Sequence, residues 1–307
     1  MKFGAHLPLI GFDDRPWTLD RMASYARTAA RLRYVTLAAN DHLVFPKPWF
    51  DGPTALAVAL PHAGEMTLMT SVALPVVRGP AALAKTLGAL DALSGGRVIA
   101  GVGPGSSARD YALVGVSFEE RWPRFEESVR AMRALWSGDG SAHAGAFYDT
   151  TGFRLDPPPA RDGGPPIWIG SWGSGAGMRR VARLADGWLA SAYNATPATF
   201  AEAKAALDAE LARRGKDPAT FPNALATTFM YVTEDAGEAR RIIEQVIAPT
   251  INRPPEQLAE RLLVGSAAAC AEKVAAYETA GLRQVLVWPV ADEERQLEIF
   301  RERVASR

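Results

Sequence analysis

Two histidines lie at the ends of apolar segments that are typical of buried strands, where a side chain can move a proton. His42 follows Asp41 directly after the segment 34–40, and His6 lies within the segment 3–8. Imidazole titrates near neutral pH, and a neighbouring carboxylate can fix its tautomer and orientation. Asp41 and His42 are therefore the candidate catalytic pair. Capping of the following loop would explain Asp41 and His42 equally well, and His6 could be an ordinary core residue.

Two glycine-rich segments follow other apolar runs. The first, GVGPGSS at 101–107, has Ser106 where the dinucleotide-binding fingerprint G-x-G-x-x-G needs its last glycine. A Rossmann-type NAD(P) dehydrogenase is therefore disfavoured, although the glycines would still let a planar ligand approach the backbone. The second, GSWGSGAG at 170–177, precedes a helical pattern. Backbone N–H groups at the start of that helix would bind a phosphate, the alternative being a plain turn between strand and helix.

Metal and serine-hydrolase chemistry have little support in this sequence. The chain has one cysteine, Cys270, and no HExxH motif, so the usual zinc spacings are missing. It also lacks the G-x-S-x-G turn of the α/β-hydrolases. We expect no metal site.

The order of elements favours a barrel. Helical patterns at 80–94, 123–136, 197–214 and 266–281 alternate with β-rich runs. Alternation of this kind predicts a (β/α)8 TIM barrel in preference to an open doubly wound sheet, with function at the carboxyl ends of the strands. The eight predicted strands are 3–8, 34–40, 66–74, 97–102, 166–171, 187–192, 224–232 and 284–290.

Two long connections interrupt the regular alternation. Residues 103–165 follow the fourth predicted strand and include a strand-like stretch at 147–155, and residues 233–283 follow the seventh. Neither has the apolar pattern of a separate core. We therefore expect one domain over 1–307, with insertions after strands 4 and 7.

Composition limits the partners. The 34 basic and 34 acidic residues balance, and no cluster of Lys and Arg suggests a nucleic-acid surface. No stretch approaches the roughly 18 apolar residues needed to cross a bilayer. A single cysteine fits a reducing compartment. We expect a cytoplasmic protein that binds neither nucleic acid nor membrane.

Taken in order, several motifs resemble those of the luciferase-like flavin and deazaflavin oxidoreductases, which are (β/α)8 barrels. The strongest match is LAKTLGALDALSGGRVIAGVGPG at 83–105. Supporting matches run through nearly the whole chain: Asn40-Asp41-His42, Thr70-Ser71-Val72, Arg121 with Glu127, 166–177, 185–188 and 265–281.

The resemblance implies roles for these residues. His42 would donate or accept a proton beside a reactive ring carbon, with Asp41 at its side. The peptide bond between Ser71 and Val72 would be cis and would press against the ring, and 173–177 would hold the phosphate. The implied cofactor-binding residues are His6, Asp41, Ser71, Val72, Gly103, Gly105, Ser106, Gly170, Ser171, Gly173, Ser174, Gly175, Ala176 and Gly177.

An aromatic wall is expected for the substrate. Trp49 is similar to an aromatic residue that shields the ring in some relatives, and Phe12, Tyr111 and Trp172 would join it if their loops converge. Sugar-phosphate dehydrogenases of the family carry a glutamate where Ser106 stands, which argues against their substrate here.

The resemblance implies a redox enzyme acting on a small organic substrate. We expect coenzyme F420 in preference to reduced FMN, and therefore hydride transfer in preference to oxygen activation. A non-catalytic flavin-binding barrel remains the alternative. Many relatives are homodimers, and the apolar face of 123–136 could serve such an interface, although core packing explains it equally well.

Overall fold

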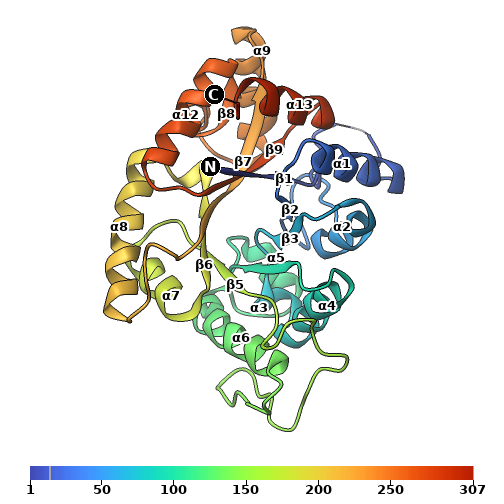
Figure 1. Cartoon of the computed structure of the whole chain (residues 1–307), viewed down its shortest axis with the longest axis vertical. Coiled ribbons are helices and arrows are strands. Elements are labelled where there is room, and N and C mark those ends of the chain that lie inside the picture. Colours follow the sequence, from blue (N-terminus) through green and yellow to red (C-terminus); the bar gives the residue numbers. More distant parts are fainter. Residues whose placement is uncertain (14, 307) are drawn as a thin grey trace.

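Parallel pairing of successive strands closes a barrel in this chain. The computed structural model describes residues 1–13 and 15–306, and Figure 1 shows strands in the centre with helices around them. Within those residues the strands are β1 (Lys2–His6), β2 (Thr36–Ala39), β3 (Thr67–Thr70), β4 (Val98–Val102), β5 (Ile167–Gly170), β6 (Gly187–Ser191), β7 (Asn223–Val232), β8 (Leu263–Gly265) and β9 (Gln284–Pro289).

Helices connect these strands and cover the outside of the barrel. They are α1 (Leu19–Arg31), α2 (Gly52–Ala59), α3 (Pro75–Arg78), α4 (Pro80–Leu93), α5 (Ala108–Leu113), α6 (Arg121–Trp136), α7 (Gly175–Leu184), α8 (Pro197–Arg213), α9 (Ala236–Arg241), α10 (Ala248–Ile251), α11 (Pro255–Arg261), α12 (Ala267–Thr279) and α13 (Glu293–Arg303). In the part of the chain so described, no helix is both long enough and apolar enough to cross a bilayer.

The long strand β7 completes the ring. Its first residues pair with β6, its middle pairs with β9, and β9 pairs with β1. The ring therefore runs β1 to β7 and then β9, which confirms the predicted (β/α)8 barrel. The register between β7 and β9 shifts between Leu225 and Thr228, as at a β-bulge.

All eight predicted strands are present, and a ninth was missed. Strand β8 pairs with the last residues of β7, outside the closed ring. A three-residue strand gives no periodicity to detect. The prediction of strand-like structure at 147–155 was wrong. That segment contributes only Asp149 to an isolated bridge with Ala144, and the rest of it has no strand. The long connections after β4 and β7 lie where they were predicted.

Apolar side chains fill the barrel on both sides of its wall, as parallel strands require. The outward-facing side chains form one continuous core with the helices, and a smaller cluster fills the interior. That interior cluster consists of Ala38, Met69, Trp168, Leu189, Ala224, Ala226 and Leu286.

The apolar face of α6 belongs to this core. Phe125, Val129, Met132 and Trp136 are all buried within the chain, and α6 packs on α4. Trp136 also donates its indole N–H to the carbonyl of Ala84. Core packing therefore accounts for this stripe, and it is not left free for a partner subunit.

Candidate active site

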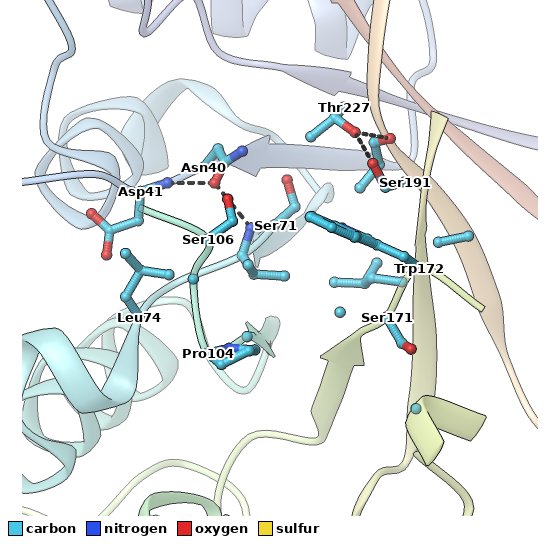
Figure 2. A pocket seen from close by; sticks show the side chains of 18 of the residues that line it. Asn40, Asp41, Ser71, Leu74, Pro104, Ser106, Ser171, Trp172, Ser191 and Thr227 are labelled. Carbon is cyan, nitrogen blue, oxygen red and sulfur yellow. Dashed lines mark hydrogen bonds between the residues drawn. The ribbon is translucent and has the colours of Figure 1, made fainter. Parts of the chain in front are cut away.

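A cavity of about 440 Å³ opens at the carboxyl ends of the strands. Its volume lies in the range of about 300–1,000 Å³ that small-molecule sites occupy. Figure 2 shows side chains from opposite walls of the barrel facing this space. The lining residues are Asn40, Asp41, His42, Ser71, Val72, Leu74, Gly103, Pro104, Gly105, Ser106, Phe118, Arg121, Trp122, Gly170, Ser171, Trp172, Ser174, Gly177, Leu189, Ala190, Ser191, Tyr193, Ala226 and Thr227.

Most of the residues chosen from the sequence meet at this cavity. Those in its lining are Asp41, His42, Ser71, Val72, Gly103, Gly105, Ser106, Gly170, Ser171, Trp172, Ser174 and Gly177. Gly173, Gly175 and Ala176 belong to the same turn as Ser174 without reaching the lining.

Four other predicted residues lie outside the lining: His6, Phe12, Trp49 and Tyr111. Trp49 packs edge-on against the ring of His42, with centroids 4.7 Å apart, and Phe12 packs on Phe229. Tyr111 is buried and donates its hydroxyl to the carbonyl of Pro104. These three side chains therefore support the walls. The aromatic residues that do line the cavity are Phe118, Trp122, Trp172 and Tyr193.

His42 is oriented by a carboxylate that was not anticipated. Its Nδ1 atom lies 2.7 Å from Oδ2 of Asp110, in the first turn of α5. The other oxygen of Asp110 accepts the backbone N–H groups of Leu43 and Val44, at 3.0 and 2.9 Å. Burial alone would raise the pKa of Asp110, but the hydrogen bonds from His42 and from these amides outweigh it and lower that pKa. An ionised Asp110 only accepts, so Nδ1 carries a proton and Nε2 is left free.

Asp41 faces away from its neighbour. Its carboxylate is 1% exposed and makes a two-pronged ion pair with Arg78, with both N–O distances 2.6 Å. Arg78 also pairs with Asp51, the N-cap of α2. Asp41 therefore ties the loop after β2 to the end of α3, and the expectation that it orients His42 is not met.

The Ser71–Val72 peptide bond is cis, as the resemblance implied. The side chain of Val72 fills space that two glycines leave open: a Cβ atom on Gly103 or Gly170 would lie 2.8 or 2.9 Å from a Val72 methyl. These glycines therefore make room for Val72, whereas the sequence had suggested room for a ligand. Asn40 accepts the N–H of Val72 on its Oδ1 atom, at 3.2 Å.

Ser71 presents an unused polar atom beside this turn. Its side chain is 1% exposed and lines the cavity, and its hydroxyl oxygen has no hydrogen-bond partner among the residues that the structure describes. Buried hydroxyl groups are nearly always paired. The arrangement suits a ligand that carries a polar edge.

Positive charge and helix geometry meet at another part of the lining. Ser174 caps α7 and accepts the N–H of Gly177 at 3.2 Å, while both residues face the cavity. Arg121 lies in the same lining and donates to the carbonyl of Phe118 at 2.9 Å. No carboxylate among residues 1–13 and 15–306 lies within 4.0 Å of its guanidinium nitrogens. The guanidinium packs over the ring of Phe118, 4.1 Å from its centroid. A guanidinium without an acidic partner and a helix N-terminus in one cavity are both suited to a phosphate.

His6 ends β1 and is fully buried. Its ring stacks on Trp288 with centroids 3.5 Å apart, and Nδ1 lies 2.8 Å from the carbonyl of Leu7. Burial lowers its pKa to about 3, against a smaller opposing effect of the Leu7 contact. His6 is therefore neutral at physiological pH and packs in the core.

Several functional candidates were missed. Asp110 follows Ser107 by three residues, a pattern that reads as an ordinary helix start. Ser191 and Thr227 end or interrupt apolar strands and carry no motif. The sequence did carry a signal for Arg121, because Arg121 with Glu127 is one of the motifs that resemble the family.

Comparisons with known proteins identify the family and the fold of this chain. The sequence profile of luciferase-like monooxygenases matches residues 5–261. An F420-dependent hydroxymycolic acid dehydrogenase of Mycobacterium tuberculosis is 30% identical over 231 residues, or 72% of this chain and 61% of that protein. An F420-dependent glucose-6-phosphate dehydrogenase of Rhodococcus erythropolis is 29% identical over 305 residues, covering 89% of this chain and 88% of the relative. This chain thus spans less than two thirds of the first relative.

Solved structures share the fold. An F420-dependent secondary alcohol dehydrogenase superposes with a TM-score of 0.85 at 18% identity, over 99% of this chain and 98% of its own. The monooxygenase RslO1 of Streptomyces bottropensis superposes with a TM-score of 0.83 at 20% identity, over 100% and 99% of the two chains.

Proposed function

The chain belongs to the luciferase-like monooxygenase family, and from this membership we propose that it is an oxidoreductase that uses coenzyme F420. The observation that carries the proposal is the His42–Asp110 pair at the edge of a cavity with a separate site for an anion. The names of the two sequence relatives favour F420 in preference to reduced FMN. The reaction would interconvert a small alcohol and its carbonyl compound.

The residues present fit a phosphorylated deazaflavin. Ser71 would offer its unpaired buried hydroxyl to a polar ring edge, and Val72 would present an apolar side chain to the ring. Arg121 and the start of α7, with Ser174 and Gly177, would hold the phosphate. When bound, the deazaflavin would supply a ring carbon that exchanges a hydride with the substrate.

The chain itself would manage the proton. Asp110 holds the proton of His42 on Nδ1, so Nε2 can accept the proton of a substrate hydroxyl and return it to a carbonyl oxygen in the reverse direction. Asp110 acts as a positioning residue in this scheme, because it touches His42 and not the substrate. Trp49 and Phe45 pack against the His42 ring and limit its rotation and its contact with water.

Direct titration tests the choice of cofactor. Purified protein is titrated separately with F420 and with FMN, and binding is followed by the fluorescence of each ring. We expect F420 to bind near micromolar concentrations and FMN at least about 10-fold more weakly. Binding of FMN alone would support the oxygen-activating alternative, and binding of neither would remove the redox proposal.

A flavin-binding barrel without catalysis is the competing function. The pairing of His42 with Asp110 favours catalysis, because binding of a flavin for storage does not require an oriented group that transfers protons. His42→Ala separates the two: turnover of an alcohol in the presence of F420 should fall on the order of 100-fold while F420 affinity stays nearly unchanged. Equal turnover in the two proteins would reject the role of His42.

We also propose that the protein is cytoplasmic and that it forms a homodimer, the second of which the resemblance implies. The buried thiol of Cys270 is unpaired, which fits a reducing compartment. The face of α6 is occupied by the core, so an interface would have to use another surface. Light scattering of the purified protein gives its mass directly.

A further inference from the structure

Two hydroxyl groups face the cavity from the wall across from His42. Ser191 ends β6, and Thr227 lies at the irregularity of β7. In the ring of eight strands, β6 is four places from β2 and β7 is four places from β3, so each lies on the opposite side of the barrel. Figure 2 shows both hydroxyls across the cavity from Asp41 and Ser106, with Trp172 between. The proton transfer proposed above does not use them.

The hydrogen bonds around these hydroxyls run in one direction. Arg253 can only donate, and it contacts Oδ1 of Asn194 at 3.2 Å, so the amide of Asn194 must present Nδ2 on its other side. That Nδ2 group donates to Ser191 Oγ at 3.0 Å. Thr227 gives its single proton to the carbonyl of Ala226 at 2.6 Å. The 3.1 Å contact between the two hydroxyls is therefore donated by Ser191 and accepted by Thr227.

This accounting leaves only acceptors for a ligand. A hydroxyl group has one proton and two lone pairs. Ser191 and Thr227 have each committed the proton and filled one lone pair. Burial raises the pKa of the Tyr193 phenol and a side-chain hydrogen bond with Ser191 lowers it, so the Tyr193 hydroxyl donates to the second lone pair of Ser191. The lone pair left for a ligand is therefore that of Thr227. Ser191 and Thr227 are both 8% exposed, and both line the cavity.

The backbone fixes the position of this acceptor pair. Thr227 has φ of 56°, in the left-handed region that β-branched residues avoid. It is held there at the point where the register between β7 and β9 shifts. On the neighbouring β6 side, Arg261 donates to the carbonyl of Tyr193, which fixes the turn that carries Asn194. The insertion after β7 thus braces the pair through Arg253 and Arg261.

The charges of the cavity are already matched. Among its lining residues, Asp41 is paired with Arg78 and His42 with Asp110. Arg121 is the remaining cation in that lining, and the proposed function assigns it to the cofactor phosphate. The substrate side therefore offers no unmatched charge to an ionic group.

We propose that Ser191 and Thr227 form a substrate-recognition subsite, which accepts a hydrogen bond from an O–H or N–H group of an uncharged substrate, remote from the carbon that reacts near His42. The inference rests on the proposed function for the location of the reacting carbon. It narrows the substrate class to neutral molecules that carry a second hydrogen-bond donor. A ketone or ether oxygen at that position would face a lone pair of Thr227 and bind less well.

Two ligands test this subsite, the second having a methyl group in place of one hydroxyl hydrogen of the first. Cyclohexane-1,4-diol and 4-methoxycyclohexanol are titrated by calorimetry into the F420-loaded protein and again into the cofactor-free protein. One neutral hydrogen bond corresponds to roughly a 5-fold difference in affinity. We expect the diol to bind about 5-fold more tightly to the unaltered protein. Equal binding, tighter binding of the methoxy compound, or binding of neither would overturn the proposal.

Thr227→Val tests the direction of the hydrogen bonds that link Asn194, Ser191 and Thr227. The change removes the acceptor of the Ser191 proton, so the subsite gains a donor. The ratio of the affinities for the diol and the methoxy compound should then fall to about 1. Thr228→Val is the matched control, because the Thr228 hydroxyl bonds to the carbonyl of Leu225 and lies outside the cavity lining. It should keep the 5-fold preference, and loss of the preference in both variants would contradict the assignment.

Titration of F420 into the same variants keeps this proposal separate from the previous one. Unchanged F420 affinity in Thr227→Val, together with the lost diol preference, assigns the pair to the substrate. A loss of F420 affinity in that variant alone would assign the pair to the cofactor ring and overturn the inference. If F420 binds to none of the proteins, the proposed function fails, while the diol preference of the cofactor-free protein still reports on the subsite.

Discussion

The Nδ1 atom of His42 lies 2.7 Å from the Oδ2 atom of Asp110, although 68 positions separate the two residues in the chain. Because Asp110 also holds the two amides that follow His42, it fixes both the ring and the backbone that carries it. The loop after β2 and the helix after β4 therefore act as one unit.

Asp110→Asn should lower turnover more than it lowers cofactor affinity. The neutral amide of asparagine accepts a weaker hydrogen bond from Nδ1 than the carboxylate does. The orientation and the tautomer of His42 are therefore less well fixed. We expect turnover with F420 and an alcohol to fall about 10- to 100-fold, with the F420 dissociation constant changed less than about 3-fold. Asp162→Asn, at an exposed position, is the control and should leave both quantities unchanged. Equal losses of affinity and turnover in Asp110→Asn would mean that Asp110 serves the cofactor site.

Arg78→Gln should destabilise the fold by leaving the buried carboxylate of Asp41 without its partner. Removing one member of a buried ion pair costs about 3 kcal/mol or more. The double variant Asp41→Asn with Arg78→Gln should regain at least half of that loss, because a neutral amide replaces the unpaired charge. Urea unfolding measures both. Arg31→Gln removes an exposed ion pair with Glu298 and should cost less than about 1 kcal/mol. A double variant as unstable as Arg78→Gln would show that the charge of Asp41 is not the cause.

Acid should destabilise the protein through His6. Its pKa is about 3 in the folded chain and near 6.5 in the unfolded chain, so between these values only the unfolded chain takes up the proton. Stability therefore falls as pH decreases from about 6.5 towards 3. Between pH 7.5 and pH 5.0 this group should contribute a loss of about 2 kcal/mol.

His6→Phe removes this titration and keeps a ring against Trp288. The free energy of unfolding, measured with urea, should fall between pH 7.5 and pH 5.0 by about 2 kcal/mol less in the variant than in the unaltered protein. This difference should hold whatever the stability of the variant at pH 7.5. A loss of equal size in both proteins would mean that His6 takes up a proton in the folded chain.

Arg121→Gln should weaken the binding of a phosphorylated cofactor in particular. The guanidinium has no acidic partner within the described chain and lines the same cavity as Ser174 and Gly177, so its charge is available to a phosphate bound there. We expect F420 to bind about 10- to 100-fold more weakly, with little change for a deazaflavin that lacks the phosphate. Fluorescence titration gives both constants. Arg130→Gln on the same helix should leave both unchanged, since Arg130 pairs with Glu126 and lies outside the cavity lining. Equal weakening of both ligands by Arg121→Gln would remove the phosphate contact.

Much of the barrel was predictable from local patterns. The eight ring strands are short apolar runs bounded by helix signals, and Thr196 and Ser266 cap helices where the sequence placed their starts. The missed strand β8 has three residues and is defined only by its pairing with the end of β7. The opposite error at 147–155 has the same cause, because β-prone residues become a strand only when a neighbouring strand is available.

The location of the site could be predicted from the sequence, but most of the contacts between its side chains could not. Strand ends meet at one rim in any barrel of this kind, so His42, Ser71 and Ser174 could be expected to share a cavity. The partner of His42 could not be read from spacing, because Asp110 comes from another βα unit. The aromatic lining shows the same limit: Trp172 was anticipated, whereas Phe118 and Trp122 replace Phe12 and Tyr111.

The sequence by itself determined the alternation of strands and helices, the closed barrel they form, and the rim at which the chemistry lies, because apolar periodicity and capping are local properties. Tertiary structure decided that Asp41 pairs with Arg78, that Asp110 orients His42, and that Ser191 and Thr227 meet. Adjacent residues in a loop point in different directions, and only closure of the barrel brings side chains from separate loops within hydrogen-bond distance.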